Sequence, residues 1–288
     1  MAWISTLQLD YSRAQEQVAP SDSANGHART RVHSVHAGPL RVLKSLYPEG
    51  PAICHNVLVH PPGGLTGGDT LNIDVRVASG AHGLITTPSA TRFYRTDGET
   101  ALQDAQLFLA EGARLEWLPL ESIAYSGCRA HNRLHMALEP GAELMGWDVT
   151  ALGLPHANLP FTRGSFCQHI ALAGAWLERG QVDAGDLRLM MGPQGLAGYT
   201  CFASLFFAAG NALPRARRAL ALDAARAAIA LHPLAATAGV TSPNPQVVVA
   251  RVLAAQVEPV MQLLQAVRAA WRCELWDLPG TSPRIWAM

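Results

Sequence analysis

The chain has 288 residues, of which 49% are hydrophobic and only 15% are charged, and its formal net charge is zero. A neutral chain has no basic surface to hold nucleic acid or an anionic membrane, so the composition argues against both function classes. The length allows a large buried core, and the low charge predicts that partner proteins cover part of the apolar surface.

The cysteines and the N-terminus indicate the compartment. Five cysteines are scattered along the chain and never form a Cys-x-x-Cys pair, which is typical of reduced thiols in a cytosol. Residues 1–4 lack the basic start and apolar core of a signal peptide. Apolar stretches such as 199–209 are too short to cross a membrane. We therefore expect a soluble, cytoplasmic protein.

The first two-thirds of the chain is typical of β-strands. Residues 14–30, rich in Gln, Ser, Asp, Asn and Gly, are expected to form a flexible loop before this region. From about residue 31 to residue 210, apolar residues alternate with polar ones, as expected for strands with one buried face. The alternation is seen at Leu71/Ile73/Val75/Val77, Leu107/Leu109, Leu115/Trp117, Leu134/Met136/Leu138 and Leu187/Leu189.

A strand–turn–strand pattern recurs around Gly80, Gly112 and Gly141. Each glycine is followed by alanine and then by another apolar strand, and the glycines lie about 30 residues apart, a period typical of stacked repeats. This spacing favours a stack of β units, each of which buries its apolar face on the next. A β-sandwich with similar hairpins would give a comparable pattern.

The last third contains helical segments. Alanine-rich residues 215–231 and amphipathic residues 259–271 are predicted helices, with strands expected at 238–241 and 246–253 between them. We therefore predict a mainly β protein and a single domain over residues 1–288. Its stacked, β-helix-like body covers about 31–210, and its C-terminal part, about 211–288, holds about two α-helices.

The segment 60–69 (HPPGGLTGGD) contains four glycines in six positions: Gly63, Gly64, Gly67 and Gly68. A phosphate-binding loop needs a lysine and a hydroxyl residue after its last glycine, whereas Asp69 follows here and would repel a phosphate. The pattern predicts a tight double turn in which glycine permits positive φ. Asp69 either serves a function at the end of this turn or caps the amides of the turn.

Metal-binding and catalytic motifs are weak. His131 and His135 lie four residues apart, with Cys128 just before them, but on a strand they would be about 13 Å apart. We therefore expect no tight metal site. GxSxG and SxxK motifs are absent. A β-helical carbohydrate hydrolase or lyase stays a competing hypothesis, although only 7% of the residues are aromatic and they are widely spaced.

Several motifs, in order, resemble the UreD (UreH) family of urease accessory proteins. The matching segments are 38–40 (GPL), 47–49 (YPE), 54–55 (CH), 60–69, 84–95 (LITTPSATRFYR), 115–119 (LEWLP), 147–148 (WD), 152–153 (LG), 177–179 (LER) and 283–286 (PRIW). They run nearly from end to end, and the glycine loop followed by the TRFYR element is specific.

The resemblance implies a β-rich, helix-like stack of strands with two helices and no enzymatic activity of its own. It implies action with a UreF-type partner and a UreG-type GTPase on the urease apoprotein. Nickel would pass in transit through an internal, water-filled tunnel, with no tightly bound cofactor, and the GTPase would hydrolyse GTP. An alternative is a structural adaptor that recruits the GTPase without conducting nickel.

Carried over residue by residue, the resemblance gives four nickel-path candidates: Asp69, Thr91, Asp148 and Glu178. Oxygen donors of this kind hold a hydrated divalent cation loosely and release it. Thr91 is uncharged, so we expect no direct metal role there. For each acidic residue, the alternative role is to satisfy nearby backbone amides.

Overall fold

The computed structural model describes residues 2–14 and 28–287, without the side chain of His156. Most of the predicted loop at 14–30 lies outside the described residues, and residues 14, 29 and 30 belong to strands. Strands make up 48% of the structure and helices 18%, so the predicted mainly β fold is confirmed.

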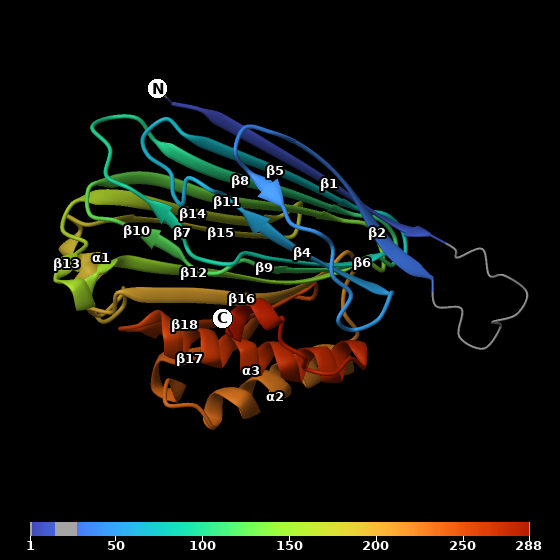
Figure 1. Ribbon diagram of the computed structural model, residues 1–288. Coiled ribbons are helices and arrows are strands. Elements are labelled where there is room, and N and C mark those ends of the chain that lie inside the picture. The colour runs from blue at the N-terminus through green and yellow to red at the C-terminus, as the bar shows by residue number, and fades with distance from the viewer. Residues whose placement is uncertain (1, 15–27, 288) are drawn as a thin grey trace, which may run out of the picture.

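Two sheets lie face to face, and the two C-terminal helices pack beneath the larger one (Figure 1). The smaller sheet has seven strands in the order β15 (Trp176–Asp183), β14 (Gly164–Leu172), β11 (Cys128–Leu138), β8 (Ala101–Leu109), β5 (Thr70–Val77), β1 (Ile4–Ala14) and β2 (Arg29–Ala37). Its strands from β1 to β14 are parallel, and the edge strands β2 and β15 are antiparallel to their neighbours.

The larger sheet has eleven strands. Its main path is β17 (Ala238–Asn244), β18 (Val247–Ala254), β16 (Cys201–Ala209), β12 (Glu143–Leu154), β9 (Arg114–Leu118), β6 (His82–Thr86), β4 (Ile53–Val59) and β3 (Arg41–Val42). The short strands β7 (Thr91–Phe93), β10 (Ser122–Ala124) and β13 (Leu159–Pro160) pair beside this path. The sheets include β1, β17 and β18, which lie outside the expected body at about 31–210.

The predicted repeat explains how the two sheets are connected. Gly80, Gly112 and Gly141 all have positive φ and lie in the turns that lead from β5 to β6, from β8 to β9 and from β11 to β12. Each turn therefore carries the chain from the smaller sheet to the larger one, and successive passes add parallel strands to both. This is the β-solenoid-like stack that the spacing predicts.

Three α-helices are present among the described residues: α1 (Leu187–Met191), α2 (Arg215–Ala230) and α3 (Val257–Trp276). There are also three 3-10 turns: η1 (Pro155–Ala157), η2 (Ala235–Thr237) and η3 (Arg284–Ala287). The two C-terminal helices confirm the prediction. Within the described ranges, no helix has the length and apolar character needed to cross a membrane.

The strand expected at Leu187 and Leu189 is wrong, because these residues belong to α1. The Asp186 side chain caps this helix by accepting a hydrogen bond from the Leu189 amide at 3.0 Å. An N-terminal cap of this kind satisfies an amide that helix formation leaves free, so it favours a helical turn over a strand. A two-residue alternation was too short to outweigh that cap.

The larger sheet is buried on both faces, and β12 shows this best. Leu144 and Leu152 belong to the apolar core between the two sheets. Met145, Trp147 and Val149 belong to a second core, between the sheet and the helices. Because both faces are covered, a polar side chain on either face has to find its partners inside the protein.

Candidate functional site

The glycine loop 60–69 forms the two consecutive turns that the sequence predicts. The Gly63 amide donates to the His60 carbonyl at 2.8 Å, and the Asp69 amide donates to the Thr66 carbonyl at 3.0 Å. These two bonds close the turns at either end of the loop. The result is a rigid corner directly after β4.

The glycines let this corner pack closely against β7. Gly63 and Gly68 have φ values of +76° and +83°, which side-chain-bearing residues rarely adopt. A Cβ on Gly67 would overlap a hydroxyl of the segment after β7. Between the turns, Leu65 forms an isolated parallel bridge to Phe93. The loop is therefore paired with the TRFYR element, the other motif that carries the family resemblance.

Asp69 is 1% exposed and fastens this corner. Its Oδ2 accepts a hydrogen bond from the Thr66 amide at 2.9 Å, and its Oδ1 accepts one from the Trp3 amide at 3.2 Å. The carboxylate thus caps its own turn and ties the N-terminal strand to the loop. Burial lowers the pKa of the neighbouring His60, and the negative charge of Asp69 partly opposes that shift.

A pocket of about 270 Å³ opens beside the glycine loop. The polar side chains that line it include His60, Thr91 and Gln103, set among mostly apolar neighbours. Thr91 lies on β7 and is held there by its amide, which donates to the Glu121 carbonyl at 2.9 Å. One predicted path residue, Thr91, therefore lies in the wall of a pocket.

From the pocket wall, Gln103 begins a row of polar side chains between the two sheets. It lies on β8 in register with Asn132 on β11, which is in register with Gln168 on β14. Its Nε2 donates to the Asn132 Oδ1 at 3.0 Å. All three side chains are buried within a core that is otherwise apolar.

Asp148, on β12, reaches into this row from the opposite sheet. It accepts hydrogen bonds from Asn132 Nδ2 at 2.6 Å, from Gln168 Nε2 at 2.7 Å and from Thr150 Oγ1 at 3.3 Å. Burial raises the pKa of Asp148 to about 6, the amide and hydroxyl donors oppose the shift, and the charge of Glu178 adds to it. A carboxylate whose pKa is perturbed in this way marks a candidate functional site.

The polar side chains continue along the larger sheet toward Glu178, which lies on β15 at the edge of the smaller sheet. Ser204 on β16 is in register with both Asp148 on β12 and Arg251 on β18. The Ser204 hydroxyl donates to Glu178 Oε1 at 2.8 Å, and Arg251 Nε donates to the same oxygen at 3.3 Å. The Arg251 side chain is 46% exposed, so this end reaches the surface.

The four residues predicted from the sequence lie on or beside one line of polar side chains, which we call the polar row. The polar row consists of His60, Thr91, Gln103, Asn132, Asp148, Thr150, Gln168, Ser204, Glu178 and Arg251. Thr91 lies at its pocket end, Asp148 in its middle and Glu178 at its other end. Asp69 lies beside His60, with both carboxylate oxygens bonded to backbone amides.

Sequence reasoning did not single out the other seven members of the polar row as site residues. They are His60, Gln103, Asn132, Thr150, Gln168, Ser204 and Arg251. A signal was present, since Asn132 and Gln168 interrupt the apolar alternation of their strands at core-facing positions. A polar residue in such a position has to be hydrogen-bonded inside the protein, and this makes it a candidate for function.

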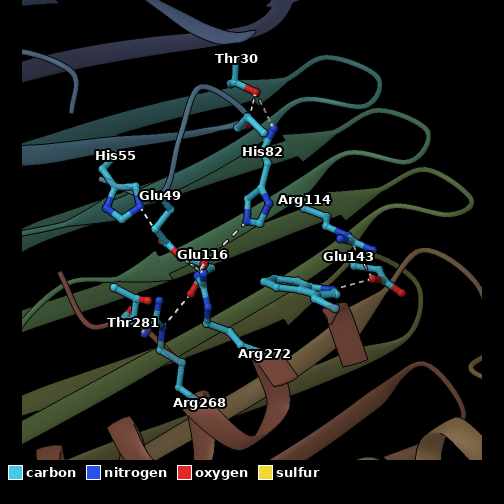
Figure 2. Close-up of polar contacts among 12 residues, drawn as sticks. Thr30, Glu49, His55, His82, Arg114, Glu116, Glu143, Arg268, Arg272 and Thr281 are labelled. Atoms are coloured by element: carbon cyan, nitrogen blue, oxygen red, sulfur yellow. Dashed lines mark hydrogen bonds and ion pairs between the residues drawn. The ribbon is translucent and has the colours of Figure 1, made fainter. Parts of the chain in front are cut away.

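A second buried cluster fastens α3 to the larger sheet (Figure 2). Glu116 on β9 accepts hydrogen bonds from Arg268 Nε at 2.7 Å and from Arg272 Nη1, and all three residues are 0% exposed. Arg272 also pairs with Glu49, whose other oxygen lies 2.9 Å from His55 Nε2. We call these five residues the ion cluster.

The arginines decide the charge of Glu116. Burial by itself would raise its pKa, but His82 and the charges of Arg268 and Arg272 lower it to about 2. His82 Nε2 lies 3.7 Å from Glu116 Oε1, too far for a hydrogen bond, so we attribute most of the lowering to the two guanidinium groups. The ion cluster is internally paired and joins two elements, which is a structural role.

The histidines and the cysteine noted in the sequence lie on β11, as predicted. Cys128 is buried, whereas His131 and His135 are partly exposed. The His135 ring lies 4.7 Å from that of His169 on β14. In the part of the chain that the structure describes, no three His, Cys, Asp or Glu side chains are arranged to hold a metal ion.

Comparison with known proteins identifies the family. The model of the UreD urease accessory protein family matches residues 12–287. The chain is 60% identical to the urease accessory protein UreD of Variovorax paradoxus (strain S110) and to that of Polaromonas sp. (strain JS666 / ATCC BAA-500), and 61% identical to that of Paracidovorax citrulli (strain AAC00-1). Each alignment covers 100% of both chains. The chain therefore belongs to the UreD family of urease accessory proteins.

Proposed function

We propose that this chain is a non-enzymatic accessory protein that conducts nickel to urease while the urease nickel centre is being assembled. The observation that carries the proposal is the polar row, which crosses an apolar core from the pocket to the opposite edge of the sheets. Buried polar side chains are costly unless they are fully bonded. A row of them along one line is therefore better explained by transport than by packing.

The chemistry of the row suits a cation in transit. Its side chains offer oxygen atoms from amides, hydroxyls and carboxylates, and these donors hold a hydrated divalent ion more loosely than a cage of thiolates and imidazoles would. Asp148 is bonded to neutral groups, so its negative charge is available to attract the ion at the midpoint. Nickel enters at the pocket in this proposal and leaves near Glu178.

Membership of the UreD family supports a set of proposed partners. In this proposal the chain works in the cytoplasm with a UreF-type protein and a UreG-type GTPase, and the complex docks on the urease apoprotein. The GTPase supplies hydrolysis, because the glycine loop here ends in Asp69 and lacks the lysine of a phosphate-binding loop. Large exposed apolar side chains, such as those of Leu159, Leu187 and Met191, leave surface for a partner to cover.

Co-expression with urease tests the proposal. Urease and its other accessory proteins are produced with and without this chain, and nickel per urease and urease activity are measured. The proposal expects both values to fall sharply when the chain is absent, and equal nickel loading would contradict it. A chain that is required, but that tolerates apolar replacements throughout the polar row, would be an adaptor that does not conduct nickel.

A further inference from the structure

His60 carries a ring nitrogen that the fold leaves unused. The residue follows β4 directly and begins the glycine loop, so strand and turn fix its backbone on either side. Its imidazole packs against the ring of Trp3, with 4.9 Å between the ring centroids. Its Nε2 is buried and has no hydrogen-bond partner among the described residues.

An unpartnered buried nitrogen is unfavourable, so it needs an explanation. Two buried histidines, His55 and His82, show the contrast. His55 Nε2 lies 2.9 Å from a glutamate oxygen and is paired. His82 Nε2 lacks a hydrogen bond too, but it lies against Glu116 and feels the positive charge of Arg272, which would repel an added cation. His60 instead lines the pocket.

The donor type of His60 distinguishes it from its neighbours. Thr91 and Gln103, which line the same pocket, offer oxygen atoms that would accept any hydrated divalent ion. Imidazole nitrogen prefers nickel and its transition-metal neighbours to magnesium or calcium. Asp69 adds negative charge beside the ring, while its two oxygens hold the amides of Trp3 and Thr66.

We propose that His60 binds the incoming Ni²⁺ through Nε2 at the pocket and thereby selects nickel over harder divalent cations before the ion enters the polar row. This inference rests on the proposed function, since it assigns the entry ligand of the same path. Asp69 is then a positioning residue, because its Oδ1 holds the Trp3 amide and the Trp3 ring packs against the imidazole.

The test compares the full-length wild type with His60→Phe and His135→Ala. Phenylalanine keeps a ring against Trp3 and removes the nitrogen, whereas His135 belongs to the histidine pair on β11 and β14, away from the pocket lining. Ni²⁺ is titrated by calorimetry in excess Mg²⁺. A second measurement uses wild type labelled with ¹⁵N-histidine and records the order in which paramagnetic Ni²⁺ broadens the signals of the histidine rings. This measurement needs no variant, so it does not depend on whether a variant folds.

The expected result is a weakening of Ni²⁺ binding of about ten-fold or more in His60→Phe, unchanged binding in His135→Ala, and first broadening at His60. Unchanged binding in His60→Phe, or first broadening at His135 and His169, would overturn the inference. If urease needs the chain for nickel but His60→Phe binds and delivers nickel normally, only this inference fails. If urease loads nickel without the chain, the proposed function itself fails.

Discussion

Asp148 and Glu116 are buried carboxylates on the same large sheet, yet their surroundings are opposite. Asp148 faces the smaller sheet and accepts hydrogen bonds from neutral amides and a hydroxyl, and its pKa rises to about 6. Glu116 is bonded to two arginines of α3, and its pKa falls to about 2. Two guanidinium groups neutralise Glu116, which stabilises the packing of α3, whereas no cation among the described residues pairs with the carboxylate of Asp148.

Removing Glu116 should give the largest effect on stability. Glu116→Ala leaves Arg268 and Arg272 as buried charges without their main partner, so we expect a loss of about 3 to 5 kcal/mol in the free energy of unfolding. Denaturant titration measures the loss. The matched control is Asp223→Ala, whose carboxylate is 71% exposed and pairs with Arg226.

The Asp223 control should change the free energy of unfolding by less than about 1 kcal/mol, because exposed ion pairs contribute little. Equal effects of the two variants would mean that the ion cluster does not fasten α3.

Acid should destabilise the protein in the same way as the Glu116 substitution. The pKa of Glu116 is lowered from 4.5 to about 2, so its stabilisation is present above pH 4.5 and is lost as the pH falls through that range.

The contribution of Asp148 to the free energy of unfolding should change with pH in the opposite direction. Its pKa in the folded protein, about 6, lies above its ordinary value of 3.8, so the folded state binds the proton more tightly and the wild type loses stability as the pH rises between these values. Asp148→Asn should remove this loss, which is on the order of 3 kcal/mol across the window. Denaturant titrations at several pH values check it. A wild type and variant with parallel pH profiles would contradict the proposed environment of Asp148.

Changing one donor of Asp148 should give a smaller effect. Gln168→Leu removes a hydrogen bond that lowers the pKa of Asp148, so that pKa should rise further above 6. The free energy of unfolding should fall by about 1 to 2 kcal/mol. Carbon-13 NMR titration of the Asp148 carboxyl measures the pKa. Gln181→Leu, on an exposed part of β15, is the control and should leave that pKa unchanged.

The stacked β fold could be predicted from sequence because its signals are local. Alternation in single strands and the turns at Gly80, Gly112 and Gly141 depend on residues close together in the chain. Local composition and periodicity likewise predict the helices α2 and α3. Where a local cap competed with a short alternation, as at Asp186, the prediction failed.

The polar row and the ion cluster could not be predicted in this way. Glu116 and Arg268 are separated by 152 residues, and their contact exists only after α3 packs on the larger sheet. Gln103, Asn132 and Gln168 meet because of the register between their strands, which no single segment encodes. Resemblance to a family pointed to Asp148 and Glu178, but the neutral donors around Asp148 came from the structure alone.

The most direct test of the polar row is the nickel content of urease in cells that carry Asp148→Asn in this chain. The substitution removes the charge at the midpoint of the row and keeps the size of the side chain, and a Gln168 amide turned to face it restores the hydrogen bonds. Asp223→Asn makes the same chemical change on the surface. Co-purification shows whether each variant still assembles with its partners. We predict an assembled complex and urease poor in nickel for Asp148→Asn, with full loading for Asp223→Asn. Full nickel loading with Asp148→Asn would contradict the proposal that nickel passes along this row.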